Sequence, residues 1–199
     1  MFRRRLRAFP LIVAIAAAAL AAACQKPPSA PAYQPPSFAD RAPIRLDVAR
    51  IDVVNEYAAP ARAPNVDHLF KVTPAAAAER WARDRLRAVG AAGTARVVIR
   101  NASVVEVKLP REGGIRGALT TEQAERYDAV LEVRIEIAGD RGAQRAMVSS
   151  RAERSRTVPE DVTLEGREKA WHEMTSALMN DLDVALERQI RDNFGSFLR

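Results

Sequence analysis

The chain has 199 residues, which is enough for one domain of ordinary size, and 48% of them are hydrophobic, which suffices for a core. The formal net charge is +6, but four arginines lie within the first seven residues, and without them 27 basic side chains face 25 acidic ones. A phosphate-binding surface needs a clustered basic excess, so this near-neutral remainder argues against a nucleic-acid partner.

The N-terminus has the three parts of an export signal. A basic head, MFRRRLR, precedes an apolar stretch from Leu11 to Ala23. This stretch is shorter than the roughly 20 residues that a membrane-spanning helix needs, and it suits a signal peptide. Small residues then lead to Cys24, the only cysteine of the chain. We predict that residues 1–23 are a signal peptide and not part of the fold.

The sequence around the cysteine, LAAAC at residues 20–24, resembles the lipobox of bacterial lipoproteins. In that family the peptide is cut before the cysteine and the thiol is diacylated. The resemblance implies that Cys24 is lipidated, and two or three acyl chains attach stably because each buried methylene contributes about 0.8 kcal/mol. The alternative is ordinary secretion, with cleavage at the A-x-A pattern and an incidental cysteine.

The residue after the acylated cysteine bears on the target membrane. In enteric bacteria an aspartate at this position favours retention in the inner membrane, and this chain has Gln25. The resemblance therefore implies a lipid-anchored, periplasm-facing protein of the bacterial cell envelope, with the outer membrane favoured over the inner one. The following prolines, six of the twelve in the chain, predict an extended tether over residues 24–43.

The remaining residues, 44–199, are predicted to form a single periplasmic domain. Residues 45–57 are typical of a strand with a bulge near Ala49, because the apolar positions change phase there. Thr73 followed by Pro74 predicts a helix start, and Gly90 predicts its end.

Two stretches alternate between apolar and polar residues with the period of a strand. In residues 95–109 the apolar odd positions include Val97, Ile99, Val105 and Val107, and residues 126–138 show the same alternation. Each stretch is therefore predicted to have one buried and one wet face. This pattern is typical of an antiparallel sheet covered on one side.

The C-terminal part is predicted to contain a turn at residues 139–142, a strand at 144–157 and a long amphipathic helix over roughly 163–194. The order of elements is β-α-β-β-β-α. We therefore predict an α+β domain in which a four-stranded, mainly antiparallel sheet carries two helices packed on one face. Trp81 and Trp171 are predicted to rest in the core.

This order, behind a lipobox and a proline-rich segment, resembles two families of small envelope lipoproteins. One is the lipopolysaccharide-assembly lipoprotein that plugs an outer-membrane barrel, and the other is the auxiliary lipoprotein of bacterial lipid-transport ABC systems. The resemblance is topological and carries over no family residue except Cys24. It implies a non-catalytic accessory subunit of an envelope assembly or of a lipid or lipopolysaccharide transport system. The alternative is a periplasmic carrier that binds a lipid ligand itself.

No catalytic or metal-binding motif is recognisable in the sequence. His68 and His172 are the only histidines and lie on different predicted elements, and neither an HExxH nor a GxSxG pattern occurs. We therefore expect no enzyme activity and no cofactor.

Three residues are predicted to dock an envelope protein. Arg100 and Arg134 lie on the polar face of the predicted sheet, and Ile115 lies in the connecting loop of residues 110–124. A carrier needs a large apolar cavity, and a charged face lines acyl chains poorly, so docking is favoured.

Two further charged clusters have ordinary structural explanations. The arginines at positions 151, 154 and 156 are expected to form ion pairs across strands, and Asp181, Asp183 and Glu187 are expected to lie on a solvated helix face.

Overall fold

The computed structural model describes residues 32–110, 123–139 and 145–199. Cys24 and Ile115 lie outside these ranges, so the predictions made for them are not tested by the structure. Residues 33–199 belong to one unit by their internal contacts. No helix within the described ranges is long and apolar enough to cross a membrane.

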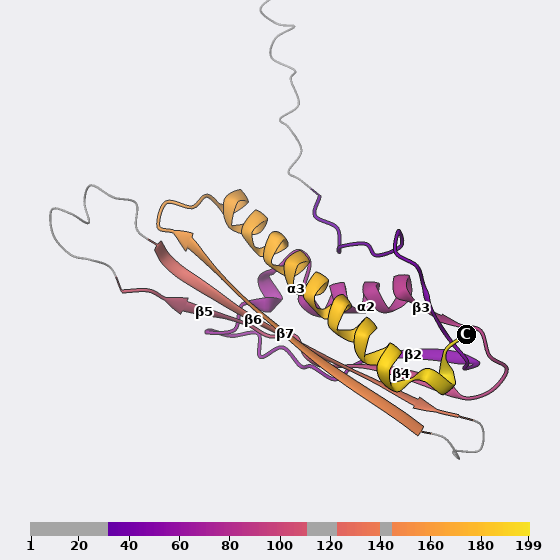
Figure 1. The fold of residues 1–199 in the computed structure, drawn as a ribbon. Coiled ribbons are helices and arrows are strands. Elements are labelled where there is room, and N and C mark those ends of the chain that lie inside the picture. The colour runs from indigo at the N-terminus through magenta and orange to yellow at the C-terminus, as the bar shows by residue number, and fades with distance from the viewer. Residues whose placement is uncertain (1–31, 111–122, 140–144) are drawn as a thin grey trace, which may run out of the picture. The chain divides into compact units, whose positions relative to one another are not determined.

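Two long helices, α2 (Pro74–Arg85) and α3 (Leu164–Asn193), form one layer (Figure 1). Both begin at a threonine cap, since Thr73 accepts a hydrogen bond from the Ala76 amide at 3.1 Å and Thr163 accepts one from the Gly166 amide at 3.0 Å. The predicted start of the first helix is confirmed, and the last helix matches its predicted range.

The predicted end of the first helix at Gly90 is wrong. The chain leaves α2 at Arg85 and passes directly into the short strand β3 (Leu86–Ala88). Gly90 has a different role, because a Cβ atom there would lie 2.6 Å from the backbone of Asp47 and Val48. Only glycine permits this close approach of the two chain segments.

The second layer is a five-stranded sheet, not the four-stranded sheet predicted. Its strands are β2 (Arg50–Asn55), β4 (Thr94–Asn101), β5 (Val104–Lys108), β6 (Gln123–Ala138) and β7 (Arg145–Pro159). β2 pairs in parallel with β4, and β4, β5 and β7 each pair antiparallel with β6. β7 pairs along the whole of one edge of β6. β4 and β5 therefore lie end to end along the other edge of β6.

The break between β4 and β5 explains both the extra strand and a wrong prediction of side-chain direction. Ile99 is fully buried before the break and Val104 is fully buried after it, an odd and then an even position. Val105 pairs with Asp128 and Val107 with Arg126. These two valines therefore face away from the core, contrary to the uniform alternation predicted for residues 95–109.

The predicted strand at residues 45–57 is also divided. Its first part, β1 (Ile44–Leu46), pairs in parallel with β3 as a separate two-stranded sheet, and only its second part, β2, joins the main sheet. Two short 3₁₀ helices, η2 (Asp67–Leu69) and η4 (Gly195–Phe197), complete the elements of the described ranges.

Both helices cover the same face of the main sheet (Figure 1). The apolar stripe of α3 packs against the odd positions of β6, which are buried as predicted. Trp81 and Trp171 are buried, and Trp171 stacks on Phe70 at 4.5 Å and meets the edge of Tyr127 at 5.4 Å. Within the described ranges, no helix covers the opposite face of the sheet, and we call it the helix-free face.

The chain before the first strand packs against the helix layer. We call residues 33–42 the strap. Phe38 is 2% exposed within the core, and its amide donates to Asp84 of α2 at 3.0 Å. Although proline-rich, the second half of the predicted tether thus lies on the domain.

Candidate docking surface

The helix-free face carries rows of side chains that continue from strand to strand. In one row Asp52, Arg96, Glu136 and Met147 are in register across β2, β4, β6 and β7. The face as a whole is a mixture of both signs, because its arginines at 50, 96, 100, 126, 134, 145 and 151 are matched by acidic residues at 52, 56, 128, 132, 136 and 153. We expect such a balanced face to complement another mixed-charge surface rather than to attract one sign of ion.

The structure brings the two predicted docking arginines to neighbouring positions on this face. Arg134 pairs with Val98 of β4, and Arg100 follows two residues further along that strand. Arg100 donates to the Glu56 carboxylate at 2.6 Å, and Arg134 Nε lies 2.8 Å from Glu136 Oε1. Their side chains remain 45% and 29% exposed, so both can still meet a partner.

Glu56 joins two arginines on this part of the face, and it was not among the docking residues predicted from the sequence. Its carboxylate accepts hydrogen bonds from Arg100 and, at 3.0 Å, from Arg96. The hydrogen bond from Arg100 is the main cause of a lowered pKa of Glu56, against a smaller opposing effect of desolvation. The sequence held only a weak indication of this contact. Glu56 is an acidic residue at the end of a predicted strand, and the next predicted strand carries basic residues.

A hollow of about 580 Å³ lies at one end of the helix-free face. It is lined by two cross-strand rows, which contribute Arg50, Asp52, Arg96, Glu136 and Arg145. Met147 adds an apolar side chain that is 61% exposed. An open hollow with charges of both signs and one exposed apolar group suits a protein surface better than an acyl chain.

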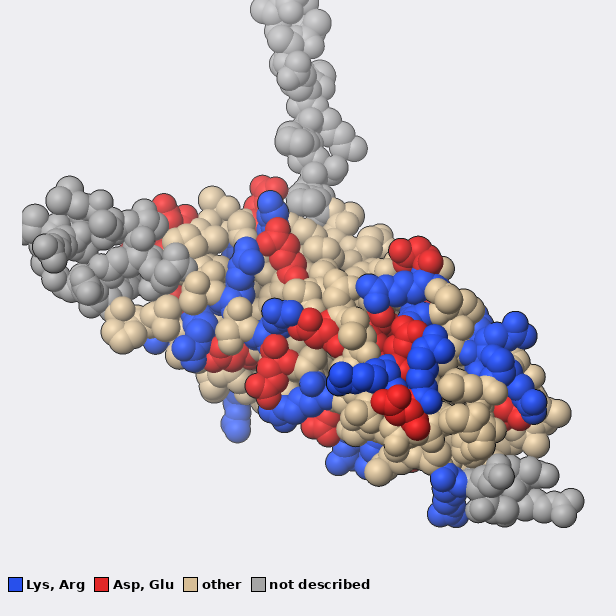
Figure 2. Space-filling view, in the orientation of Figure 1, with Lys and Arg blue, Asp and Glu red and all other residues tan. Residues whose placement is uncertain are grey.

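The three arginines of β7 at positions 151, 154 and 156 form ion pairs within the molecule. Arg151 lies 3.9 Å from Glu132 on β6, which is the expected cross-strand pair. Arg154 instead reaches Asp181 of α3 at 2.5 Å, and Arg156 reaches Glu173 of α3 at 3.0 Å. These contacts link α3 to the sheet at exposed positions, and Figure 2 shows basic and acidic side chains interspersed over the side it displays.

The prediction that Asp183 lies on a solvated helix face is wrong. It is fully buried between the helices, where it accepts hydrogen bonds from Trp81 at 2.6 Å and from Arg85 Nε at 2.7 Å. Arg41 of the strap forms an ion pair with the same carboxylate, and Arg85 also pairs with Glu187. We call Arg41, Arg85, Asp183 and Glu187 the buried charge cluster.

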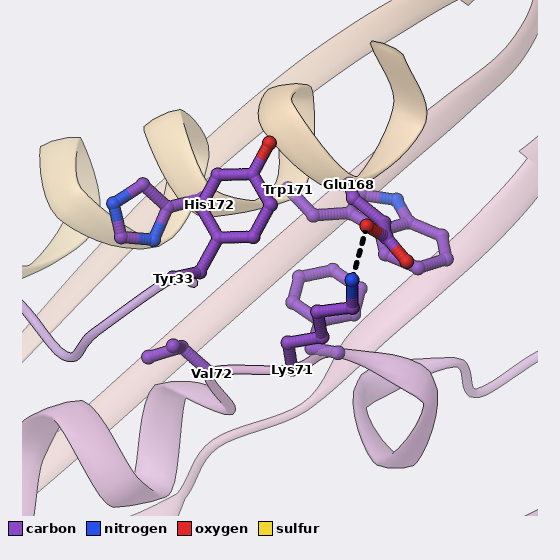
Figure 3. Close-up of a pocket in the computed structure, with 7 residues that line it drawn as sticks. Tyr33, Lys71, Val72, Glu168, Trp171 and His172 are labelled. Carbon is purple, nitrogen blue, oxygen red and sulfur yellow. Dashed lines mark hydrogen bonds and ion pairs between the residues drawn. The ribbon is translucent and has the colours of Figure 1, made fainter. Parts of the chain in front are cut away.

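A small cavity lies where the strap meets α3 (Figure 3). Tyr33 of the strap lies against His172 with the rings 4.9 Å apart, and Lys71 donates to Glu168 at 2.6 Å. The volume of about 10 Å³ is close to what one water molecule requires, so the cavity is far too small for a lipid. In the described part of the chain, no three His, Cys, Asp or Glu side chains are grouped to hold a metal ion.

No protein-family model and no curated protein matches the chain. Among solved structures it is similar to the rare lipoprotein B from Shewanella oneidensis, with 16% identity over 69% of this chain and 98% of that one and a TM-score of 0.31. A DUF330 protein from Xanthomonas campestris is 8% identical over 77% and 91%, with a TM-score of 0.33. A dodecameric PelC variant from Paraburkholderia phytofirmans is 13% identical over 69% and 88%, with a TM-score of 0.23. All three of these TM-scores are below 0.5.

Proposed function

We propose that the chain is a lipid-anchored, periplasm-facing lipoprotein of the bacterial cell envelope. In this proposal it acts as a non-catalytic accessory subunit of an envelope assembly or of a lipid or lipopolysaccharide transport system. Acylated Cys24 attaches it to the membrane, with the outer membrane favoured. The helix-free face, including Arg100 and Arg134, docks on an envelope protein.

The observation that carries this proposal is the difference between the two faces of the sheet. One face is closed by α2 and α3, while the other presents a lattice of half-exposed ion pairs that leaves its arginines accessible. Exposed ion pairs contribute little to stability, whereas complementary charges across an interface set partner choice and association rate. The lattice is therefore better suited to recognition than to holding the fold together.

The packing between helices and sheet argues against the lipid-carrier alternative. Side chains that line a cavity large enough for a lipid have solvent-accessible surface on the side of the cavity. Leu178, Leu182 and Leu186 of α3 and the facing residues Leu131, Val133 and Ile135 of β6 all have none. The layer where a carrier would hold acyl chains is filled by side chains instead.

The anchor is tested by Cys24→Ser. We expect this variant to lose labelling by radioactive palmitate and to leave the membrane fraction, because it removes the only thiol. Labelling equal to that of the unmodified chain would contradict the lipoprotein assignment.

The docking surface is tested by reversing Arg100 and Arg134 together to glutamate. We expect an unchanged melting temperature and a loss of envelope proteins recovered with the acylated protein. The matched control reverses Lys169 and Arg188, two exposed positions on α3, with the same change of net charge. Recovery that falls equally in both double variants would show a net-charge effect and overturn the assignment of the surface.

A further inference from the structure

The strap is held to the helix layer by a buried aromatic side chain, by hydrogen bonds and by an ion pair. Phe38 is buried in the core, and the Ser37 hydroxyl and the Phe38 amide both donate to Asp84 of α2. The strap also supplies Arg41 to the buried charge cluster, while the Ala42 carbonyl accepts a hydrogen bond from Arg85.

The contacts of the strap with buried groups make it an integral part of the domain. Asp183 is fully buried and pairs with Arg41 of the strap and with Arg85 of α2. If the strap left, Asp183 would lose one of these two cationic partners, Arg85 would lose the Ala42 carbonyl as an acceptor, and Phe38 would leave the core. These losses are unfavourable together, so the strap stays docked in the folded protein.

The docked strap shortens the link to the lipid. Eight residues, 25–32, separate Cys24 from Tyr33. An extended chain spans at most about 3.5 Å per residue, which limits this link to roughly 30 Å. The predicted tether up to residue 43 would have reached about twice as far.

The side on which the chain enters the domain is equally defined. Tyr33 lies beside His172 of α3, and the rest of the strap contacts α2 and α3 through Asp84, Asn180 and Asp183. The strap therefore attaches to the helix layer, which lies across the sheet from Arg100 and Arg134.

We infer that the anchored protein turns its helix layer toward the membrane and its helix-free face away from it. The partner of that face is then a protein surface that projects beyond the bilayer surface, not the lipid headgroups of the membrane that holds the anchor. This inference rests on the acylation of Cys24 in the proposed function. The balanced charge of the face agrees with it, because anionic headgroups attract a basic excess and this face has almost none.

Energy transfer to the membrane surface tests the orientation. The acylated full-length protein is placed in vesicles of phosphatidylethanolamine and phosphatidylglycerol that carry an acceptor dye on the headgroup. A donor dye is attached to a single introduced thiol, either Val184→Cys on α3 or Met147→Cys on the helix-free face. These positions are a matched pair, being 64% and 61% exposed, and the native thiol is consumed by acylation.

We expect about twofold greater transfer from position 184 than from position 147, because a helix layer about 10 Å thick and the sheet separate them. Equal transfer, or greater transfer from position 147, overturns the inference. In both labelled proteins, Phe38→Ala with Arg41→Ala should abolish the difference, because the strap is then released.

Two further measurements keep the outcomes distinct. Hydrogen exchange on the protein without substitutions should show a protected Phe38 amide, and exchange at the rate of an unfolded chain would show that the strap is not docked. Mass spectrometry reports the acyl chains on Cys24. A chain without them contradicts the proposed function, whereas an acylated chain with equal transfer contradicts only the orientation.

Discussion

The same residue types serve opposite purposes in two regions of the molecule. In the buried charge cluster, Asp183 and Arg85 are almost fully enclosed and hold the strap and both helices together. On the helix-free face, Glu56, Arg96 and Arg100 form ion pairs of similar length but stay partly exposed. Burial, and not the length of the ion pair, decides how much removing one partner destabilises the fold. Water screens the exposed pairs and cannot reach the buried ones.

The largest effect is expected from Asp183→Asn. This change leaves Arg85 buried with less compensation, and breaking a buried pair typically costs about 3 to 5 kcal/mol in the free energy of unfolding. The measurement is a urea titration. The matched control is Asp181→Asn, two residues earlier on the same helix, where the lost partner Arg154 is exposed and little change is expected. Equal losses in the two variants would contradict the distinction between the regions.

A smaller loss is expected from Arg41→Ala. Its side chain is 40% exposed, and Asp183 keeps its hydrogen bonds from Trp81 and Arg85 when Arg41 is removed. We expect the free energy of unfolding to fall by about 1 to 2 kcal/mol. This is less than the loss for a fully buried pair, because solvent screens the pair of Arg41 with Asp183. Differential scanning calorimetry measures it, with Arg45→Ala as the control at an exposed position nearby. A loss as large as that of Asp183→Asn would place Arg41 among the fully enclosed charges.

Much of the layered fold was readable from the sequence, because both helix starts and the buried face of β6 follow from local chemistry and periodicity. Thr73 and Thr163 cap their helices whatever packs around them. The errors arose where tertiary contacts override local pattern. The break at Ala102 and Ser103 reverses the faces of the following strand, and the pairing of β1 with β3 removes a segment from the main sheet.

The buried charge cluster could have been suspected from two helical patterns. Arg85 continues the spacing of Ala78, Trp81 and Ala82, and Asp183 adjoins the apolar stripe at Leu182. A charge on the apolar side of each of two helices suggests an ion pair between them. Arg41 could not have been added in this way, because a proline-rich segment has no periodicity to show which face it docks on.

The strap should loosen in acid through Asp84. Burial raises the pKa of this carboxyl, but hydrogen bonds from the Phe38 amide and Arg80 outweigh burial and lower it overall. A lowered pKa contributes stability above the unfolded value of about 3.9, and this contribution is lost as pH falls through the folded value. The protection of the Phe38 amide, measured as its exchange rate relative to that of an unfolded chain at the same pH, should therefore fall below about pH 4 and stay constant between pH 5 and 7. Asp84→Asn should remove this acid dependence, and an unchanged profile in that variant would assign the loosening to another group.

The smallest effect on stability is expected from Glu56→Gln. The pKa of Glu56 is lowered by Arg100, yet the carboxylate is exposed and its arginine partners are free to meet water instead. The melting temperature should stay within experimental error at low and at high salt. A clear loss of stability that salt reverses would show that the lattice on the helix-free face helps hold the fold together.

Photocrosslinking in cells tests the docking role of the helix-free face most directly. A photoreactive amino acid is placed at Ser149, which pairs with Arg134 on that face, or at Val184 on the outer side of α3, both exposed. We predict a discrete crosslink to an envelope protein from position 149 that disappears when Arg100 and Arg134 are reversed, and none from position 184. A crosslinked protein from position 184 alone would contradict the docking role of the helix-free face and place the docking surface on the helix layer.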